Sequence, residues 1–295
     1  MRADAEAQLR AMGVHDPVAE SRWLLEAVTG MDVAEQILES EGPATRRATA
    51  ELDALLARRA AGEPIQYVLG AWTFCDLELL IDPRVLIPRP ETEVVAQIGV
   101  AEVERLGERV GAPEPWGGGL THYAVADLGT GAAALALALA ASLPDAEVWA
   151  TDVSEPALAV AHANIAASGT LATRVRVAHG SWFDALPLEL RGSLLVVVSN
   201  PPYIADHEVL PASVVDWEPS QALISGPTGL EAVEHLLTTA PEWLDEAGTL
   251  VLEVAPHQAE PAMSMAWAAG FAEVFVRPDL AGHDRALVAR RRADR

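Results

Sequence analysis

The spacing of apolar side chains changes near residue 70 of this 295-residue chain. Before that point apolar residues recur every three or four positions, as in residues 23–28, which is the period of an amphipathic helix. Gly13, Gly30 and the Gly42-Pro43 pair interrupt the pattern, because glycine and proline end helices. Residues 1–70 are therefore predicted to form a small helical bundle, which is either a substrate-recognition domain or a stabilising cap.

A period of two follows in residues 71–92. Apolar residues take alternate positions from Trp72 to Phe74 and again from Leu77 to Ile81, on either side of Cys75-Asp76. Two such runs around a short turn predict a β-hairpin, which would link the helical bundle to the rest of the chain.

Two prolines stiffen the segment that ends this linker, Leu86 to Glu93. Thr92, or the residues just before it, is expected to cap a helix that starts near Glu93. Because the prolines hold Arg89 and Glu91 in a defined place, these two residues are candidates for an active-site wall. A plain linker is the alternative.

Beyond a predicted loop at residues 111–119, apolar strand patterns and helical patterns alternate. The alternation predicts an α/β fold for residues 93–295, with a doubly wound, mostly parallel sheet and ligand sites at the strand carboxyl ends. Residues 290–295 are expected to be a solvated tail. Strands are predicted at 124–127, 147–152, 174–178, 194–199, 249–254 and 286–289, and helices at 132–142, 155–168, 230–240 and 258–269.

A glycine-containing turn, Asp127-Leu128-Gly129-Thr130-Gly131, follows the first of these strands. Between a strand and a helix, such a turn lets the backbone approach a nucleotide-like ligand. Asp152 ends the next predicted strand, where a carboxylate can accept both ribose hydroxyls. A dinucleotide site would have a third glycine, so S-adenosylmethionine fits better. Trp182 or Phe183 is a candidate to stack on its adenine, with core packing as the alternative use.

The apolar run that ends at Ser199 is followed by Asn200-Pro201-Pro202-Tyr203. Proline cannot continue the hydrogen-bond ladder, so the strand must end there and present Asn200 at its carboxyl end. The Asn200 side chain and the turn carbonyls then form an acceptor-rich ledge that suits a planar NH2 group. Holding that group with its lone pair toward an electrophile is catalysis by positioning. A polar turn after a core strand is the alternative.

Composition narrows the classes of function. Acidic residues outnumber basic ones 43 to 20, and a net charge of −23 at pH 7 makes a poor surface for nucleic acid. The single cysteine, Cys75, excludes an internal disulfide and suits a reducing compartment. Without a visible secretion signal or an apolar stretch of bilayer length, we expect a cytoplasmic protein with no membrane partner.

Together these motifs resemble the HemK-type or PrmC release factor glutamine methyltransferases. The Asn-Pro-Pro-Tyr motif alone is shared with adenine-N6 DNA methyltransferases, but its combination with Pro-Arg-Pro-Glu-Thr-Glu in this order is specific. The resemblance runs from about Gly62 to Arg290 and rests on Gly62-Glu63-Pro64-Ile65-Gln66-Tyr67, Ile87-Pro88-Arg89-Pro90-Glu91-Thr92-Glu93, Asp127-Leu128-Gly129-Thr130-Gly131, Asn200-Pro201-Pro202-Tyr203 and Asp279-Leu280-Ala281-Gly282-His283-Asp284-Arg285.

The resemblance implies a Rossmann-like class I S-adenosylmethionine-dependent methyltransferase domain, preceded by a small N-terminal helical bundle and a linking β-hairpin. It implies methylation of the side-chain amide nitrogen (N5) of the glutamine in the Gly-Gly-Gln motif of peptide-chain release factors. S-adenosylhomocysteine would be the other product. We expect a monomer that needs no metal.

The resemblance also implies a role for single residues. It places the glutamine amide against the Asn200 side chain and the Pro201 carbonyl, with Tyr203 packing on it, as the catalytic residues. The other substrate-binding residues would be Pro202, Arg89 and Glu91. The cofactor-binding residues would be Asp127, Gly129, Thr130, Gly131, Asp152 (to the ribose), Ser181, Trp182 and Asn200.

Two positions depart from the family pattern. Ala132-Ala133 stands where a small residue and a further glycine are usual, and Ser181 replaces the usual aspartate. If position 133 needs a positive φ, alanine costs roughly 1–2 kcal/mol there and cofactor binding would be weaker. The alternatives are N5-glutamine methylation of a ribosomal protein, an adenine-N6 nucleic-acid methyltransferase, and a weakened or non-catalytic homologue.

Overall fold

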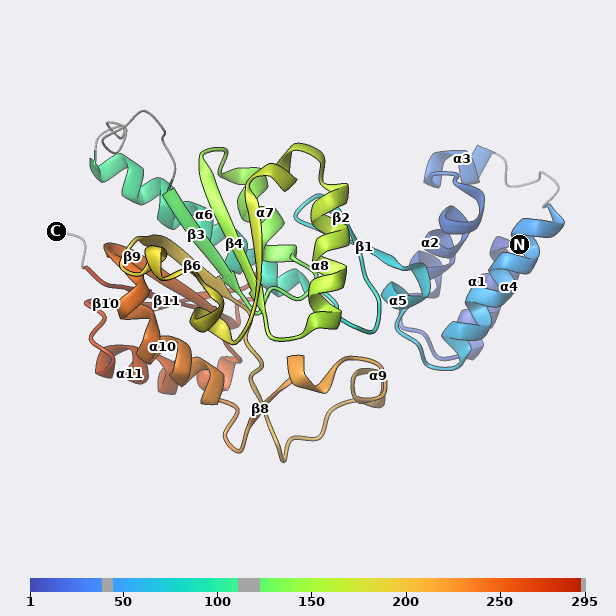
Figure 1. Cartoon of the computed structure of the whole chain (residues 1–295). Helices are drawn as coiled ribbons and strands as arrows, with labels where there is room; N and C mark the ends of the chain where they lie inside the picture. Colours follow the sequence, from blue (N-terminus) through green and yellow to red (C-terminus); the bar gives the residue numbers. More distant parts are fainter. Residues whose placement is uncertain (39–44, 111–122, 293–295) are drawn as a thin grey trace. The chain divides into compact units, whose positions relative to one another are not determined.

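A computed structural model describes residues 1–38, 45–110 and 123–292 (Figure 1). The predicted helix break at Gly42-Pro43 and the predicted loop at residues 111–119 lie outside these ranges. The chain divides into two compact units, Met1–Trp72 with Pro211–Trp217 and Thr73–Leu210 with Glu218–Arg295. Among the described residues, no helix is both long enough and apolar enough to cross a membrane.

The first unit is helical. Its helices are α1 (Arg2–Ala11), α2 (Pro17–Thr29), α3 (Val33–Leu38), α4 (Arg46–Ala60), α5 (Ile65–Leu69) and α9 (Ala212–Val215). Asp16 begins α2 by accepting a hydrogen bond from the Ala19 amide at 2.9 Å, and Gly30 ends the helix with a φ of +71°. Leucines of α1, α2 and α4 share one buried cluster, as their spacing predicted.

The predicted hairpin is present as β1 (Ala71–Phe74) and β2 (Leu77–Leu80). Its turn residues, Cys75 and Asp76, both have positive φ, at 47° and 60°, as a type I′ turn requires. Burial raises the pKa of the Cys75 thiol to about 11, so this side chain stays protonated at neutral pH.

A seven-stranded sheet organises the second unit, in the order β10-β11-β9-β6-β3-β4-β5 (Figure 1). Neighbouring strands from β9 to β5 run parallel, and β11 is antiparallel to both of its neighbours. The strands are β3 (Tyr123–Leu128), β4 (Ala146–Asp152), β5 (Val175–His179), β6 (Leu194–Ser199), β9 (Leu244–Glu253), β10 (Glu273–Pro278) and β11 (Asp284–Arg290), with β7 (Ile204–Ala205) and β8 (Ile224–Gly226) forming a separate pair.

Different helices cover the two faces of this sheet. They are α6 (Pro90–Val110), α7 (Ala134–Ser142), α8 (Glu155–Ala167), α10 (Glu231–Trp243) and α11 (Ala259–Ala268). A Cβ atom on Gly99 of α6 would come within 2.8 Å of the Val198 side chain on β6. Val197 faces the other way and shares a cluster with α10 and α11. The central strand is therefore buried on both faces, which explains its continuous apolar run.

The predicted fold class is confirmed, and every predicted strand and helix of this unit is present within a few residues. Several details differ. Strand β10 and the short pair β7–β8 were not predicted, β9 begins at Leu244 rather than at 249, and α6 begins at Pro90 rather than near Glu93. Proline suits the first position of a helix because its missing N–H has no partner there. Thr92 thus lies inside the first turn of α6 and is not its cap.

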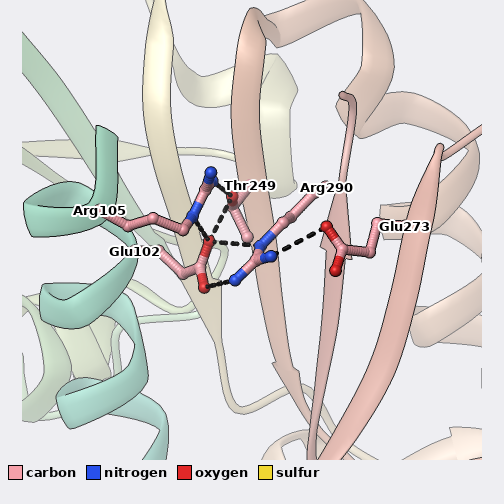
Figure 2. Close-up of polar contacts among 5 residues, drawn as sticks. All are labelled: Glu102, Arg105, Thr249, Glu273 and Arg290. Carbon is pink, nitrogen blue, oxygen red and sulfur yellow. Dashed lines mark hydrogen bonds and ion pairs between the residues drawn. The ribbon is translucent and has the colours of Figure 1, made fainter. Parts of the chain in front are cut away.

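The expectation of a solvated tail is wrong for Arg290, which is the last residue of β11 and is buried (Figure 2). Its guanidinium lies 2.6 Å from a Glu102 carboxylate oxygen and 2.9 Å from one of Glu273. The Thr249 hydroxyl also donates to Glu102, at 3.0 Å. A buried charge needs a partner of opposite charge, and these partners link α6 to three strands of the sheet.

Candidate active site

A cavity of about 370 Å³ opens at the carboxyl ends of β3, β4 and β6, where ligand sites of open α/β sheets lie. Residues that were predicted to bind the cofactor and residues of the predicted substrate ledge line this cavity together. They are Gly129, Gly131, Asp152, Ser181, Trp182, Asn200 and Pro202. The remaining lining comes from the segment after β2, from residues 153–157 at the start of α8, and from residues 219–222.

The glycine turn is fastened to the end of β4. The amides of Gly129 and Thr130 both donate to the Thr151 carbonyl at 2.8 Å, and the Gly131 amide donates to Asp152 Oδ2 at 2.9 Å. At Gly129 the φ is +75°, and a Cβ atom would lie 3.2 Å from the Trp182 ring. Glycine meets both requirements without strain, and its backbone itself forms this wall of the cavity.

Asp127, at the end of β3, is buried beneath the turn. Its Oδ2 accepts hydrogen bonds from the Thr130 hydroxyl at 2.6 Å and from the Ala136 amide at 3.0 Å. Its Oδ1 is buried and has no partner among the described residues. Burial raises the pKa of this carboxyl to about 7. An unpaired buried acceptor of this kind suits a cationic ligand.

Asp152 lines the cavity with two oxygens that each hold one backbone amide, from Gly131 and from Ser154, at 2.9 Å. A carboxylate has about four acceptor positions, so both oxygens can accept a further hydroxyl. Burial raises its pKa, against the opposing effect of these hydrogen bonds. This arrangement fits the two hydroxyls of a ribose.

The two aromatic candidates have different surroundings. Phe183 is buried and stacks on Trp243, with ring centroids 5.8 Å apart, whereas Trp182 lines the cavity. Trp182 has a φ of 47°, which is an outlier for a bulky residue and is held by its surroundings.

Ala133 also has a left-handed backbone, with φ 64° and ψ 27°, at the start of α7. The positive φ on which the sequence argument depended is therefore present. Because the Cβ atom crowds the following carbonyl in this conformation, the strain is roughly 1–2 kcal/mol.

Asn200 follows β6 directly, as predicted, and Pro202 lies beside it in the cavity wall. The Ser199 hydroxyl donates to the Leu128 carbonyl at 2.6 Å, which holds the end of β6 against the end of β3. The Tyr203 carbonyl accepts from the Gln258 side-chain amide at 2.9 Å. Burial raises the pKa of the Tyr203 hydroxyl to about 12, so it is neutral at pH 7 and cannot serve as a base.

Two residues beside Asn200 were missed from the sequence. The Asn200 Nδ2 donates to Thr92 Oγ1 at 3.1 Å, and that hydroxyl donates to Glu253 Oε2 at 2.5 Å. Glu253 is the last residue of β9, which pairs with β6. The available signal was an acidic residue within an apolar strand, at the edge of the sheet where ligands bind.

Arg89 and Glu91 do not line this cavity. The Arg89 guanidinium pairs with the Glu218 carboxylate, which also accepts from the Ile87 amide at 3.3 Å. This pairing fastens the proline-stiffened segment to the chain that leads into residues 219–222 of the cavity wall. A contact of Arg89 or Glu91 with substrate stays a prediction.

No group of three or more His, Cys, Asp or Glu side chains within the described ranges has the arrangement of a metal site.

Comparison with known proteins gives matches over almost the whole chain. Residues 1–70 match the PrmC N-terminal domain family, and residues 119–216 match the methyltransferase small domain family. The release factor glutamine methyltransferase of Geobacter sulfurreducens is 35% identical over 96% of this chain and 92% of its own length. That of Moorella thermoacetica is 38% identical over 99% of this chain and 97% of its own.

Solved structures share the fold at low identity. The catalytic domain of human METTL16 in complex with the MAT2A 3′UTR hairpin 6 has a TM-score of 0.54 and 15% identity, covering 84% of this chain and 82% of that one. The N-terminal domain of human METTL16 in complex with SAH has a TM-score of 0.52 and 16% identity, covering 82% and 84%. These similarities show a class I S-adenosylmethionine-dependent methyltransferase fold and nothing narrower.

Proposed function

The chain belongs to the release factor glutamine methyltransferase family, and from this we propose that it methylates peptide-chain release factors. The reaction is transfer of a methyl group from S-adenosylmethionine to the side-chain amide nitrogen (N5) of the glutamine in the Gly-Gly-Gln motif. The observation that carries the proposal is that Asn200 and the Gly129–Gly131 turn line one cavity. A hydrogen-bond acceptor for an amide group and a binding surface for a nucleoside thus lie side by side.

The residues around the turn fit the cofactor. The backbone of Gly129 and Gly131 would contact the cofactor, and the Asp152 oxygens would accept hydrogen bonds from its ribose hydroxyls. The unpaired Oδ1 of Asp127 suits the cofactor's positive charge. Thr130 contributes indirectly, since its hydroxyl is bonded to Asp127. When bound, S-adenosylmethionine supplies an electrophilic methyl group on a sulfonium. Ser181 and the Trp182 ring would complete the site.

The ledge would orient the substrate. Asn200 Oδ1 and the Pro201 carbonyl accept the two N–H bonds of the glutamine amide, so that its lone pair stands out of the amide plane toward the methyl group. Each such hydrogen bond contributes about 0.5–1.5 kcal/mol net, so most of the rate comes from orientation. Tyr203 packs on the amide as a neutral ring. After transfer, the nitrogen loses one proton to water or to a ledge acceptor.

The rest of the chain would serve recognition. We assign residues 1–70 to binding of the release factor, residues 71–92 to a linker, and residues 93–295 to catalysis. Pro202, Arg89 and Glu91 would form the wall against which the Gly-Gly-Gln loop lies. We expect a cytoplasmic monomer that acts on protein without nucleic acid.

The alternatives are not favoured. The relatives that match most of the chain are named release factor glutamine methyltransferases, not ribosomal-protein or adenine-N6 enzymes. A net charge of −23 argues further against a nucleic-acid substrate. The intact ledge argues against a non-catalytic homologue.

The test is to incubate the protein and S-adenosylmethionine with a full-length release factor and to weigh the peptide that contains Gly-Gly-Gln. We expect a gain of one methyl group on the glutamine, and no gain with Asn200→Ala. Cofactor binding without any methyl gain on this peptide would refute the proposed substrate.

A further inference from the structure

A short hydrogen-bonded chain leads from the cavity into the protein interior. It runs from Asn200 Nδ2 to Thr92 Oγ1, at 3.1 Å, and from that hydroxyl to Glu253 Oε2, at 2.5 Å. The three residues come from the end of β6, the first turn of α6 and the end of β9. Thr92 is 4% exposed and Glu253 1% exposed, so water does not compete for these groups.

The direction of the chain follows from its chemistry. An ionised carboxylate can only accept, so the single proton of the Thr92 hydroxyl is committed to Glu253. Toward Asn200 that hydroxyl can then only accept, which turns the Asn200 NH2 group toward Thr92. The Asn200 Oδ1 must point the other way. No described residue donates a hydrogen bond to it, and Asn200 lines the cavity.

We propose that Thr92 and Glu253 are positioning residues that hold the Asn200 amide with Oδ1 directed at the substrate. The inference rests on the proposed function, in which Oδ1 accepts an N–H of the glutamine amide. A reversed Asn200 would set its own NH2 against the substrate NH2, two donors facing each other, and the lone pair of the substrate would lose its orientation.

The charge state of Glu253 then governs the ledge. Its pKa is raised to about 7, first by burial, against the hydrogen bond from Thr92. The charged and titratable groups facing it are Arg285 on β11, Arg89 before α6, Glu91 on α6 and Tyr203 after β6. A protonated Glu253 can donate to Thr92, which frees the Thr92 proton for Asn200 Oδ1 and reverses the amide. Turnover should therefore rise as pH increases through about 7.

The first test removes the hydroxyl while keeping the side-chain shape. Thr92→Val should lower kcat by about tenfold or more, with the cofactor Kd from calorimetry unchanged. Thr249→Val is the matched control, because Thr249 is also buried and also donates to a buried glutamate, Glu102, within a separate cluster (Figure 2). It should lower stability and leave kcat unchanged. Thr92→Ser, which keeps the hydroxyl, should restore most of the lost rate.

The second test is the pH profile of kcat at saturating cofactor. The acid limb near pH 7 should disappear in Glu253→Gln, which cannot titrate. Saturating cofactor separates this effect from Asp127, whose carboxyl has a similarly raised pKa and which we assign to cofactor binding.

A readout independent of turnover separates this inference from the proposed function. The side-chain amide protons of Asn200, followed by NMR, should be protected from solvent exchange in the wild type and unprotected in Thr92→Val. If the Asn200 protons are protected but no release factor is methylated, the proposed function is refuted and the hydrogen-bonded chain is supported. Unprotected Asn200 protons in the wild type, a normal kcat in Thr92→Val, or an acid limb that persists in Glu253→Gln would each overturn the inference.

Discussion

Replacing Ala133 by glycine tests how the altered glycine turn affects this protein. Glycine removes the left-handed strain of roughly 1–2 kcal/mol, since it has no Cβ atom to crowd the carbonyl. Two losses oppose this gain. Ala133 is fully buried, so its methyl group contributes about 0.8 kcal/mol, and glycine adds about 0.4–1 kcal/mol of chain entropy to the unfolded state. The free energy of unfolding should therefore change by less than about 1 kcal/mol.

Ala138→Gly is the matched control, because Ala138 is buried in the same helix α7 but has no strain to release. It loses a similar methyl group and pays the helix penalty of glycine, for a total of about 2 kcal/mol. Urea denaturation of both variants gives the comparison. If Ala133→Gly is as destabilising as Ala138→Gly, the positive φ at Ala133 carries no strain and the reasoning is wrong.

The same variant decides whether the strain weakens the cofactor. Protein hydrogen bonds fix the positive φ at Ala133, since its amide donates to the Thr130 carbonyl at 2.8 Å and its carbonyl accepts from the Leu137 amide at 2.9 Å, so the strain belongs to folding. A ligand responds only to a difference between its free and bound states. We therefore expect the cofactor Kd of Ala133→Gly to stay within about threefold of the wild type. A tenfold tighter Kd would show instead that cofactor binding imposes the strain.

Three further predictions concern the cavity and the buried charges. Gly129→Ala should weaken cofactor binding by about tenfold or more in calorimetry, because the new Cβ atom meets the Trp182 ring. The Cβ atom of Gly131→Ala meets nothing within 4 Å, so that variant should weaken binding less. Equal effects of the two variants would contradict this reasoning. Glu102→Ala should lower the free energy of unfolding by about 3 kcal/mol or more, since it strips a buried partner from Arg290. The pKa of Glu102 is lowered in the folded protein, so its stabilisation is present above the unfolded pKa near 4.5 and is lost as pH falls through the folded value; Glu102→Gln should flatten this acid limb in urea titrations. Because the pKa of Tyr203 is about 12, Tyr203→Phe should not alter the shape of the pH–rate profile between about pH 7 and 9, and a lost alkaline limb would show that the hydroxyl ionises.

The predictable part of the site consists of short motifs at strand ends. Glycine in the Gly129–Gly131 turn and proline after Asn200 each mark the end of a strand in the sequence. Parallel strands bring those ends to one edge of the sheet. The contact between Thr92 and Glu253 spans 161 positions and that between Glu102 and Arg290 spans 188. Each of these residues is an ordinary polar residue in a helix or strand pattern, so nothing local in the sequence marks its partner.

The missed strand β10 has a similar cause. It lies at the edge of the sheet and its residues are half-buried or exposed, so the apolar alternation that marks a strand is weak there. Arg277 and Pro278 end it where the pairing register shifts, which obscures the boundary as well.

Glu253 and Arg290 show how an unpredicted buried charge can be interpreted. Arg290 has two carboxylate partners and holds α6 to the sheet, so its burial is explained by structure alone. No ion pair within the described residues reaches Glu253, and a hydroxyl compensates only part of the free energy of burying a carboxylate. An apolar residue would be the more stable choice for that position. Trp182, with its strained backbone, also lines the cavity at this edge of the sheet. Unfavourable features that gather around one cavity indicate that its arrangement serves binding and chemistry rather than stability.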